Sequence, residues 1–274
     1  MSEKKARSMA GLPWIAAMAF FMQALDTTIV NTAIPSMAHH LNEDPLRMHA
    51  VVVAYVLTVA ACIPLSGWLA DRFGVRNTYF AAIIIFTLAS LGCGLSQTLN
   101  QLILFRILQG VGGALLLPVG RLAMLKLIPR TQFLAAMSLM SLAGLIGPLI
   151  GPTLGGWLVE VATWHWVFLI NIPMGILGIL VTFKAMPNAT EPTVKAFDFS
   201  GFVLLVFTMV GLSLGIEHLA SREYSKWFSI GLLSTGFIAA LIYAHHAHTH
   251  QNALFRSDLF KNKIYAIGVL GNFF

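Results

Sequence analysis

The stretch FMQALDTTIVNTAIP, from Phe21 to Pro35, places one carboxylate, that of Asp26, in the middle of an otherwise apolar run. A run of about 20 mostly apolar residues is long enough to cross a bilayer as a helix. Inside lipid every backbone polar group needs a partner within the protein, and a helix provides one. An ionisable group at that depth is costly unless it is paired or faces water, so Asp26 is a functional candidate.

The whole chain has the composition of a membrane protein. Hydrophobic residues make up 57% of its 274 residues and charged residues 10%, against about 25% in a soluble domain. A soluble fold of this length has too little interior to bury so much apolar surface. The net charge of +6 comes from basic residues between apolar runs and not from a basic stripe, so we expect no nucleic-acid binding.

Eight apolar segments are long enough to span a membrane, and a ninth begins near the end of the sequence. We expect spans near residues 12–34, 48–70, 78–96, 101–123, 133–157, 165–186, 199–217 and 227–245, with the start of another at 264–274. The predicted fold class is an all-α polytopic membrane protein. The last segment would cross only about half of a bilayer, so we expect a truncated product or a fragment.

Lysines and arginines in the short loops predict the orientation, because they accumulate on the cytoplasmic side. With the N-terminus inside, 13 of them lie on the inner side and 3 on the outer side. The inner residues are Lys4, Lys5, Arg7, Arg72, Arg76, Arg121, Lys126, Arg130, Lys184, Lys195, Arg256, Lys261 and Lys263, and the outer residues are Arg47, Arg222 and Lys226. We therefore expect a multi-pass protein with a cytoplasmic N-terminus.

Arg106 is the other ionisable residue at membrane depth, in the fourth expected span. The first and fourth spans open two sets of three helices, so Asp26 and Arg106 could face one hydrated cavity between the sets. Burial favours the protonated acid and a nearby cation favours the ionised one, so a substrate that displaced Arg106 could drive proton exchange at Asp26. Two alternatives remain open: Asp26 bonded to Thr27, Thr28 or Asn31, and Arg106 extended to the outer interface.

Small residues in the fifth span predict a close helix contact. Gly147, Gly151 and Gly155 are four residues apart and share one helix face, which lets two backbones approach. Pro148 and Pro152 remove backbone donors and are expected to bend the helix. This pattern indicates either tight packing alone or, in addition, a sliding seam.

The inner loop GWLADRFGVRN at 67–77 combines a glycine for close packing, Gly67, with a second for a tight turn, Gly74. Its pattern Gly67-x-x-x-Asp71-Arg72-x-Gly74-x-Arg76 resembles the loop signature of the major facilitator superfamily, with Asn77 replacing the usual final basic residue. Three more segments resemble motifs of that superfamily's fourteen-helix drug:proton antiporters, the EmrB/QacA type. They are Leu25-Asp26-Thr27-Thr28-Ile29-Val30-Asn31-x-Ala33-x-Pro35, Arg106-x-x-Gln109-Gly110-x-Gly112-Gly113-Ala114 and Gly147-x-x-x-Gly151-Pro152-x-x-Gly155-Gly156.

The resemblance implies a secondary active transporter of the bacterial inner membrane, and neither an enzyme nor a cofactor-binding protein. It implies a six-helix bundle at 1–190, two central extra helices at 191–250 and the start of a truncated C-terminal bundle at 251–274. Its implied partners are the lipid bilayer, protons, a small lipophilic substrate and the missing C-terminal helical bundle.

The motif residues take their implied roles from the same resemblance. Asp26 and Arg106 would couple protons to substrate; Gly67, Asp71, Arg72, Gly74 and Arg76 would form an inner gate; and Gly147, Gly151, Pro152, Gly155 and Gly156 would form the antiporter seam. Rival functions are a uniporter or symporter, which the seam motif argues against, and a non-transporting fragment or regulatory interaction protein.

Two histidine-containing segments carry weaker signals. HHAHTHQ at 245–251 has no cysteine or carboxylate among its histidines, so we expect a solvated or interfacial loop and no metal site, although a metal site is conceivable. His165 lies between Trp164 and Trp166, which predicts an aromatic belt at the outer interface. No phosphate-binding loop occurs, so the expected energy source is the proton gradient.

Overall fold

The computed structural model describes residues 11–188, 190, 194, 196–221, 226–250 and 253–254, and every regular element in these ranges is a helix. The helices are α2 (Leu12–Leu41), α3 (Pro45–Cys62), α4 (Leu65–Phe73), α5 (Val75–Gly94), α6 (Leu99–Leu127), α7 (Arg130–Val161), α8 (Trp166–Leu169), α9 (Asn171–Ala185), α10 (Phe199–Ser221) and α11 (Lys226–Thr249). The predicted all-α polytopic fold is confirmed, with eight spans long and apolar enough to cross a membrane. The expected ninth segment, 264–274, lies outside the described residues.

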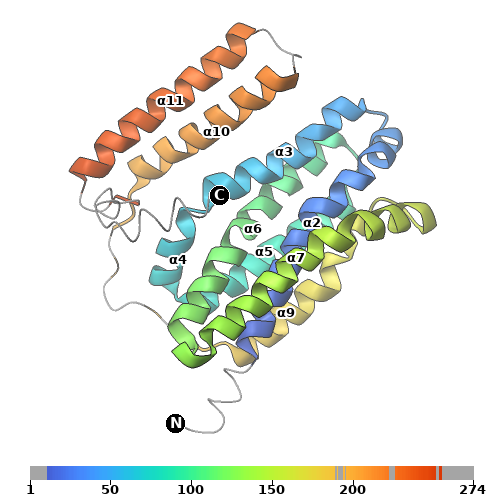
Figure 1. Ribbon diagram of the computed structural model, residues 1–274. Helices are drawn as coiled ribbons and strands as arrows, with labels where there is room; N and C mark the ends of the chain where they lie inside the picture. The colour runs from blue at the N-terminus through green and yellow to red at the C-terminus, as the bar shows by residue number, and fades with distance from the viewer. Residues whose placement is uncertain are drawn as a thin grey trace. The chain divides into compact units, whose positions relative to one another are not determined.

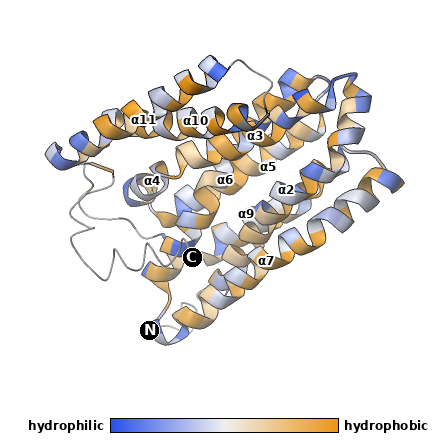
Figure 2. Ribbon diagram, turned by 45° about the horizontal axis from the view of Figure 1, so that its top comes forward, coloured by the Kyte–Doolittle hydropathy of each residue, from blue (hydrophilic) through white to orange (hydrophobic). Residues whose placement is uncertain are grey.

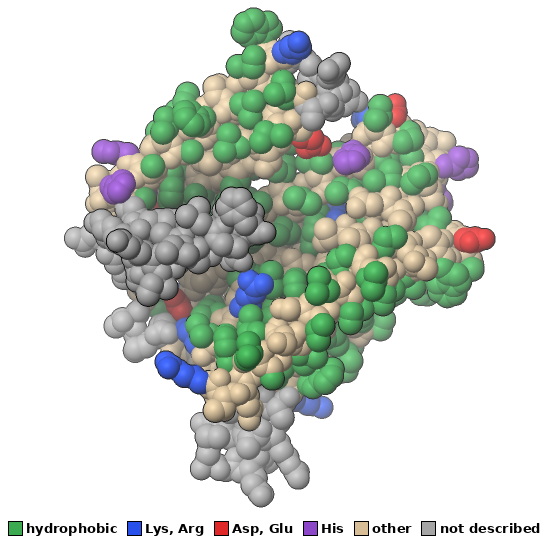
Figure 3. Space-filling model, viewed as in Figure 1, with side chains coloured by type: hydrophobic (Ala, Val, Ile, Leu, Met, Phe, Trp, Pro, Cys, Tyr) green, Lys and Arg blue, Asp and Glu red, His purple; other side chains and the backbone are tan. Residues whose placement is uncertain are grey.

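The chain divides into two compact units, Met1–Val194 and Lys195–Phe274. In the first unit the long helices run side by side (Figure 1): α2 packs on α7, and α6 packs on α3 and α5. Orange, apolar residues dominate the helices in Figure 2, and hydrophobic side chains gather over the face drawn in Figure 3. Leu145 and Leu149 of α7 are 70% and 79% exposed, as expected of side chains that face lipid.

Two expected segments differ from the structure. The second span is two helices, because Pro64 has no N–H for the helix ladder and α3 ends at Cys62. The segment between the first two expected spans, 35–47, is mostly helical: α2 continues through Pro35 to Leu41, and Asp44 caps α3 by accepting the Leu46 N–H at 2.8 Å.

The interior of the first unit has two apolar clusters with a polar layer between them. Along α2 the buried residues up to Met22 belong to the first cluster and those from Leu25 to the second. On α5 the first cluster ends at Phe86 and the second includes Cys93, so Ser90 lies between them. The polar residues of α2, α5 and α6 therefore fall at one level of the bundle.

Gly74 joins α4 to α5 with φ of +88° and ψ of 151°. Only glycine adopts this region readily, and side chains there cost about 1–3 kcal/mol. A Cβ at Gly74 would also collide with the side chain of Asn188, whose Oδ1 accepts the Arg76 N–H at 3.2 Å.

Gly74→Ala is therefore expected to lower the free energy of unfolding by about 1–3 kcal/mol, measured by thermal or denaturant unfolding in detergent. Gly67→Ala is the matched control, because a Cβ at Gly67 would have no atom within 4 Å. An equal loss of stability in both variants would contradict the role assigned to the Gly74 backbone.

Candidate functional site

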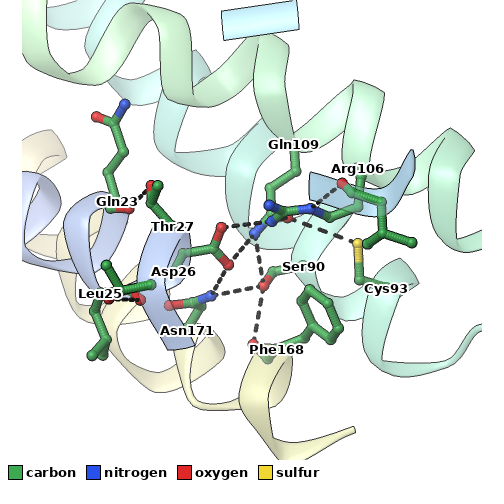
Figure 4. A network of polar contacts seen from close by, with 12 residues as sticks. Gln23, Leu25, Asp26, Thr27, Ser90, Cys93, Arg106, Gln109, Phe168 and Asn171 are labelled. Atoms are coloured by element: carbon green, nitrogen blue, oxygen red, sulfur yellow. Dashed lines mark hydrogen bonds and ion pairs between the residues drawn. The ribbon is translucent and has the colours of Figure 1, made fainter. Parts of the chain in front are cut away.

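Asp26 lies in the polar layer and accepts hydrogen bonds from three side chains on two other helices, α6 and α9 (Figure 4). Arg106 Nη1 donates to its Oδ2 at 2.6 Å, while Gln109 Nε2 and Asn171 Nδ2 donate to its Oδ1 at 2.9 and 3.1 Å. The carboxylate is 0% exposed and the arginine side chain 1%. Because removing two charges from water is costly, such a pair persists only when further hydrogen bonds complete it, as they do here.

Arg106 is held on the opposite side by α3. Its Nε donates to the Val51 carbonyl oxygen at 3.3 Å, and its guanidinium carbon lies 4.1 Å from the centre of the Tyr55 ring. Its Nη1 also donates to Gln109 Oε1 at 2.8 Å, one turn further along α6. The side chain therefore points into the bundle and does not extend to the outer interface.

The alternative in which Asp26 bonds to Thr27, Thr28 or Asn31 of its own helix is wrong, because its partners are on α6 and α9. Thr27 and Thr28 donate instead to backbone carbonyls of α2, at Gln23 and Leu25. The expected exposure of Asp26 to a hydrated cavity is also wrong for this conformation, because the carboxylate is fully buried. Helix packing closes the site, since α3, α5, α6 and α9 each contribute a residue around the pair.

The glycines of α7 face α2 directly beside Asp26. A Cβ at Gly147 would lie 2.8 Å from the Leu25 backbone nitrogen, and one at Gly151 or Gly155 would collide with the hydroxyl of Thr28 or Thr32. The two backbones therefore touch along three turns. Gly156 and Pro152 are exposed and lie off this contact, and α7 is one continuous helix through Pro148 and Pro152.

The residues of the inner-loop pattern lie mostly on α4 and not in a loop. Asp71 Oδ1 accepts from Lys126 Nζ at 3.0 Å, which links the end of α4 to α6, and both side chains are partly exposed. Arg72 is exposed, and Arg76 donates from Nε to Asn77 Oδ1 at 3.4 Å. The close packing expected at Gly67 is absent among the described residues, because the space beside it is open.

Residues 16–252 match the family model described as the Major Facilitator Superfamily. The chain belongs to this superfamily.

Similar proteins agree with this placement. Two relatives named "Putative multidrug resistance protein MdtD", from Salmonella dublin and Salmonella newport (strain SL254), are 57% and 56% identical over 260 residues, or 95% of this chain and 55% of theirs. The chain thus spans about half the length of the curated relatives it matches. The family match and these relatives point to a membrane transporter and not to an enzyme.

Solved structures show the major facilitator fold at low sequence identity. A peptide transporter POT in complex with sulfate has a TM-score of 0.63 at 15% identity, covering 91% of this chain and 57% of its own. The proton:xylose symporter XylE bound to 6-bromo-6-deoxy-D-glucose has a TM-score of 0.60 at 13% identity, covering 90% and 55%. At these identities the likeness concerns the fold alone.

Three members of the polar layer in this major facilitator chain were not predicted as site residues. Ser90 accepts from Asn171 at 3.0 Å and from Gln109 at 3.2 Å, and donates to the Phe168 carbonyl oxygen at 3.0 Å. Asn171, the first residue of α9, donates to both Asp26 and Ser90. The available signal was a polar residue within an apolar run, which Ser90, Gln109 and Asn171 all share.

Trp164, His165 and Trp166, which lie beside His40 in the last turn of α2, differ from the predicted interfacial belt. Trp164 is 1% exposed and stacks on His165 with ring centres 3.8 Å apart, whereas Trp166 is 51% exposed. His165 also contacts His40, with ring centres 5.3 Å apart. Burial, and second the proximity of His40, lower the pKa of His165, which favours its neutral form.

Proposed function

We propose that this chain forms part of a secondary active transporter of the bacterial inner membrane that exports lipophilic drugs or metabolites in exchange for protons. The observation that carries the proposal is the buried ion pair of Asp26 and Arg106, 0% and 1% exposed, in the centre of a major facilitator bundle. Intramembrane carboxylates commonly serve as proton relays. The names of the MdtD relatives support drugs as the substrate class.

The ion pair supplies the step that couples the proton to the substrate. A proton that reaches Asp26 neutralises the carboxylate and removes its ionic attraction for Arg106. Arg106 then keeps the Val51 carbonyl and Gln109 as partners, while the neutral acid keeps Gln109 and Asn171. Protonation thus weakens the link between α2 and α6 without leaving either helix unbonded.

The contact of α7 with α2 provides the moving seam of this proposal. Gly147 and Gly151 place the α7 backbone beside Leu25 and Thr28, on either side of Asp26 in the sequence. A shift of α7 along α2 therefore moves the helix that carries the acid. Small residues make such a shift inexpensive because no side chains interlock there.

The inner gate and the domain organisation complete the proposal. In this proposal residues 1–190 contain the N-terminal transporter bundle and residues 191–250 the two extra helices, while the segment assigned to a C-terminal bundle, 251–274, lies almost entirely outside the described residues. The gate residues Gly67, Asp71, Arg72, Gly74 and Arg76 lie on the cytoplasmic side, together with the N-terminus, as the distribution of lysine and arginine indicates. Opening this gate requires that Asp71 exchange Lys126 for another partner.

Asp26→Asn tests the coupling. The purified protein is reconstituted in vesicles with a lipophilic cation such as ethidium, and proton movement is followed with a pH-sensitive dye. The asparagine preserves the size of the side chain but cannot take up a proton, so substrate-driven proton flux is expected to fall by about tenfold or more, a general acid–base contribution being worth about 10²–10⁴.

Asp44→Asn is the matched control, because Asp44 is exposed and asparagine also caps a helix. Its proton flux is expected to equal that of the wild type. Equal flux in the Asp26→Asn variant would remove Asp26 from the mechanism. A correctly folded wild-type protein that moves neither ethidium nor protons would favour a non-transporting protein.

A further inference from the structure

The two helices of the second unit bring chemically suited side chains to one end of a hairpin. Helices α10 and α11 run antiparallel and in contact (Figure 1), so the start of α10 lies beside the end of α11. Asp198 immediately precedes α10, His246 lies in the last turn of α11, and His250 follows one turn later. The histidine-rich segment has no carboxylate of its own, but the fold brings Asp198 beside it from 48 residues earlier in the sequence.

The expected solvated loop at 245–251 is largely wrong, because α11 continues to Thr249. The His250 N–H donates to the His246 carbonyl oxygen at 2.8 Å and extends the helical geometry by one more residue. His246 and His250 are four residues apart and therefore share one face. Their rings stack with centres 4.7 Å apart.

Asp198 is a buried acid with a fixed orientation. Its side chain is 2% exposed, and its Oδ1 accepts the Gly201 N–H at 2.8 Å as the cap of α10. Both carboxylate oxygens lie 2.9 Å from Nε2 of His246. One ligand atom from each of Asp198, His246 and His250 lies within 4.8 Å of the others.

We propose that Asp198, His246 and His250 bind a divalent transition-metal ion, with Zn²⁺ as the best-suited ion. Zinc takes imidazole nitrogen and carboxylate oxygen at about 2.0–2.2 Å in a tetrahedron, which places two ligand atoms about 3.3–3.6 Å apart. The 2.9 Å separation of His246 and Asp198 is close to that spacing. A change of rotamer at the exposed His250 brings in the third ligand, and water takes the fourth position.

Metal binding at this place replaces the hydrogen bond between His246 and Asp198. Nε2 of His246 donates to the Asp198 carboxylate without the ion, so it releases that proton to solvent when the ion binds. The neutral imidazole then carries its proton on Nδ1 and presents Nε2 to the ion, while Asp198 keeps its cap on α10 through the Gly201 N–H. The ion would join the first residue before α10 to the end of α11. It would therefore fix the open end of the hairpin, where the side chains of Asp198 and His246 are in contact.

The experiment measures Zn²⁺ affinity of the chelator-treated protein in detergent by competition with a chromophoric chelator, and Co²⁺ coordination by visible absorption. His250→Ala removes a ligand, and Asp198→Asn removes the charge while keeping a cap-forming side chain. Each is expected to weaken binding by more than the roughly 10–100-fold that loss of a supporting hydrogen bond costs at a metal site. Co²⁺ should give a tetrahedral spectrum in the wild type that both variants lose.

His245→Ala is the matched control, because His245 is exposed, lies on the same helix and does not belong to the cluster. It is expected to retain wild-type affinity and the wild-type Co²⁺ spectrum. Unchanged affinity in both His250→Ala and Asp198→Asn would overturn the proposal even if the protein bound zinc elsewhere. The absence of saturable Zn²⁺ or Co²⁺ binding in the folded wild type would overturn it as well.

Discussion

Arg106→Leu is expected to lower the free energy of unfolding by about 3–5 kcal/mol, the usual cost of removing one partner of a buried ion pair. The variant leaves the Asp26 carboxylate 0% exposed and without its cation, although Gln109 and Asn171 still donate to it. Unfolding in mixed detergent micelles, followed by circular dichroism, measures the effect.

A second substitution separates the ion pair from simple loss of packing. Asp26→Asn in the Arg106→Leu background removes the unpaired charge and is expected to recover a large part of the lost stability. Lys126→Leu serves as the control, because the Lys126–Asp71 pair is 21% and 41% exposed and such a pair is worth at most about 1 kcal/mol. A double variant no more stable than Arg106→Leu alone would contradict the pairing.

Gly147→Leu is expected to destabilise the bundle by about 3 kcal/mol or more, at or above the upper end of ordinary overpacking costs. A Cβ there would lie 2.8 Å from the Leu25 backbone nitrogen and 2.9 Å from the Ala24 Cβ. Backbone atoms cannot rotate away as a flexible side chain can, so α7 must separate from α2. The same unfolding assay measures the loss.

Gly156→Leu is the control on the same helix. A Cβ at Gly156 has no atom within 4 Å, so the larger side chain is accommodated and stability should stay within about 1 kcal/mol of the wild type. The seam assignment fails if Gly156→Leu destabilises the protein as much as Gly147→Leu. It also fails if both variants are as stable as the wild type.

Helix identity could be predicted from the sequence, whereas several helix boundaries could not. Hydropathy predicted the eight spans that lie within the described residues, because crossing lipid demands a minimum apolar length. The helix break at Pro64 was not predicted from the sequence. Four other prolines lie inside continuous helices, namely Pro35, Pro118, Pro148 and Pro152. Proline alone does not decide the outcome, since neighbouring helices can satisfy the carbonyl group that it leaves unbonded.

The site was only partly predictable. Asp26 and Arg106 could be singled out because charges are rare in apolar runs. Ser90 and Asn171 could not be singled out as site residues, because neutral polar residues are common in membrane spans and often bond only to the local backbone. Gly156 shows the converse, since it shares a motif with Gly155 but lies off the contact with α2.

The sequence by itself determined that this protein is a set of membrane-spanning helices and that two charges lie at membrane depth. Both follow from local requirements, namely the thickness of the bilayer and the need to satisfy each backbone group within its own helix. Only the tertiary structure decided which groups meet: Asp26 with Arg106 and Asn171, and Asp198 with His246. In a membrane protein the lipid-facing and core-facing sides are both apolar, so hydropathy does not reveal how each helix is rotated, and rotation selects the partners.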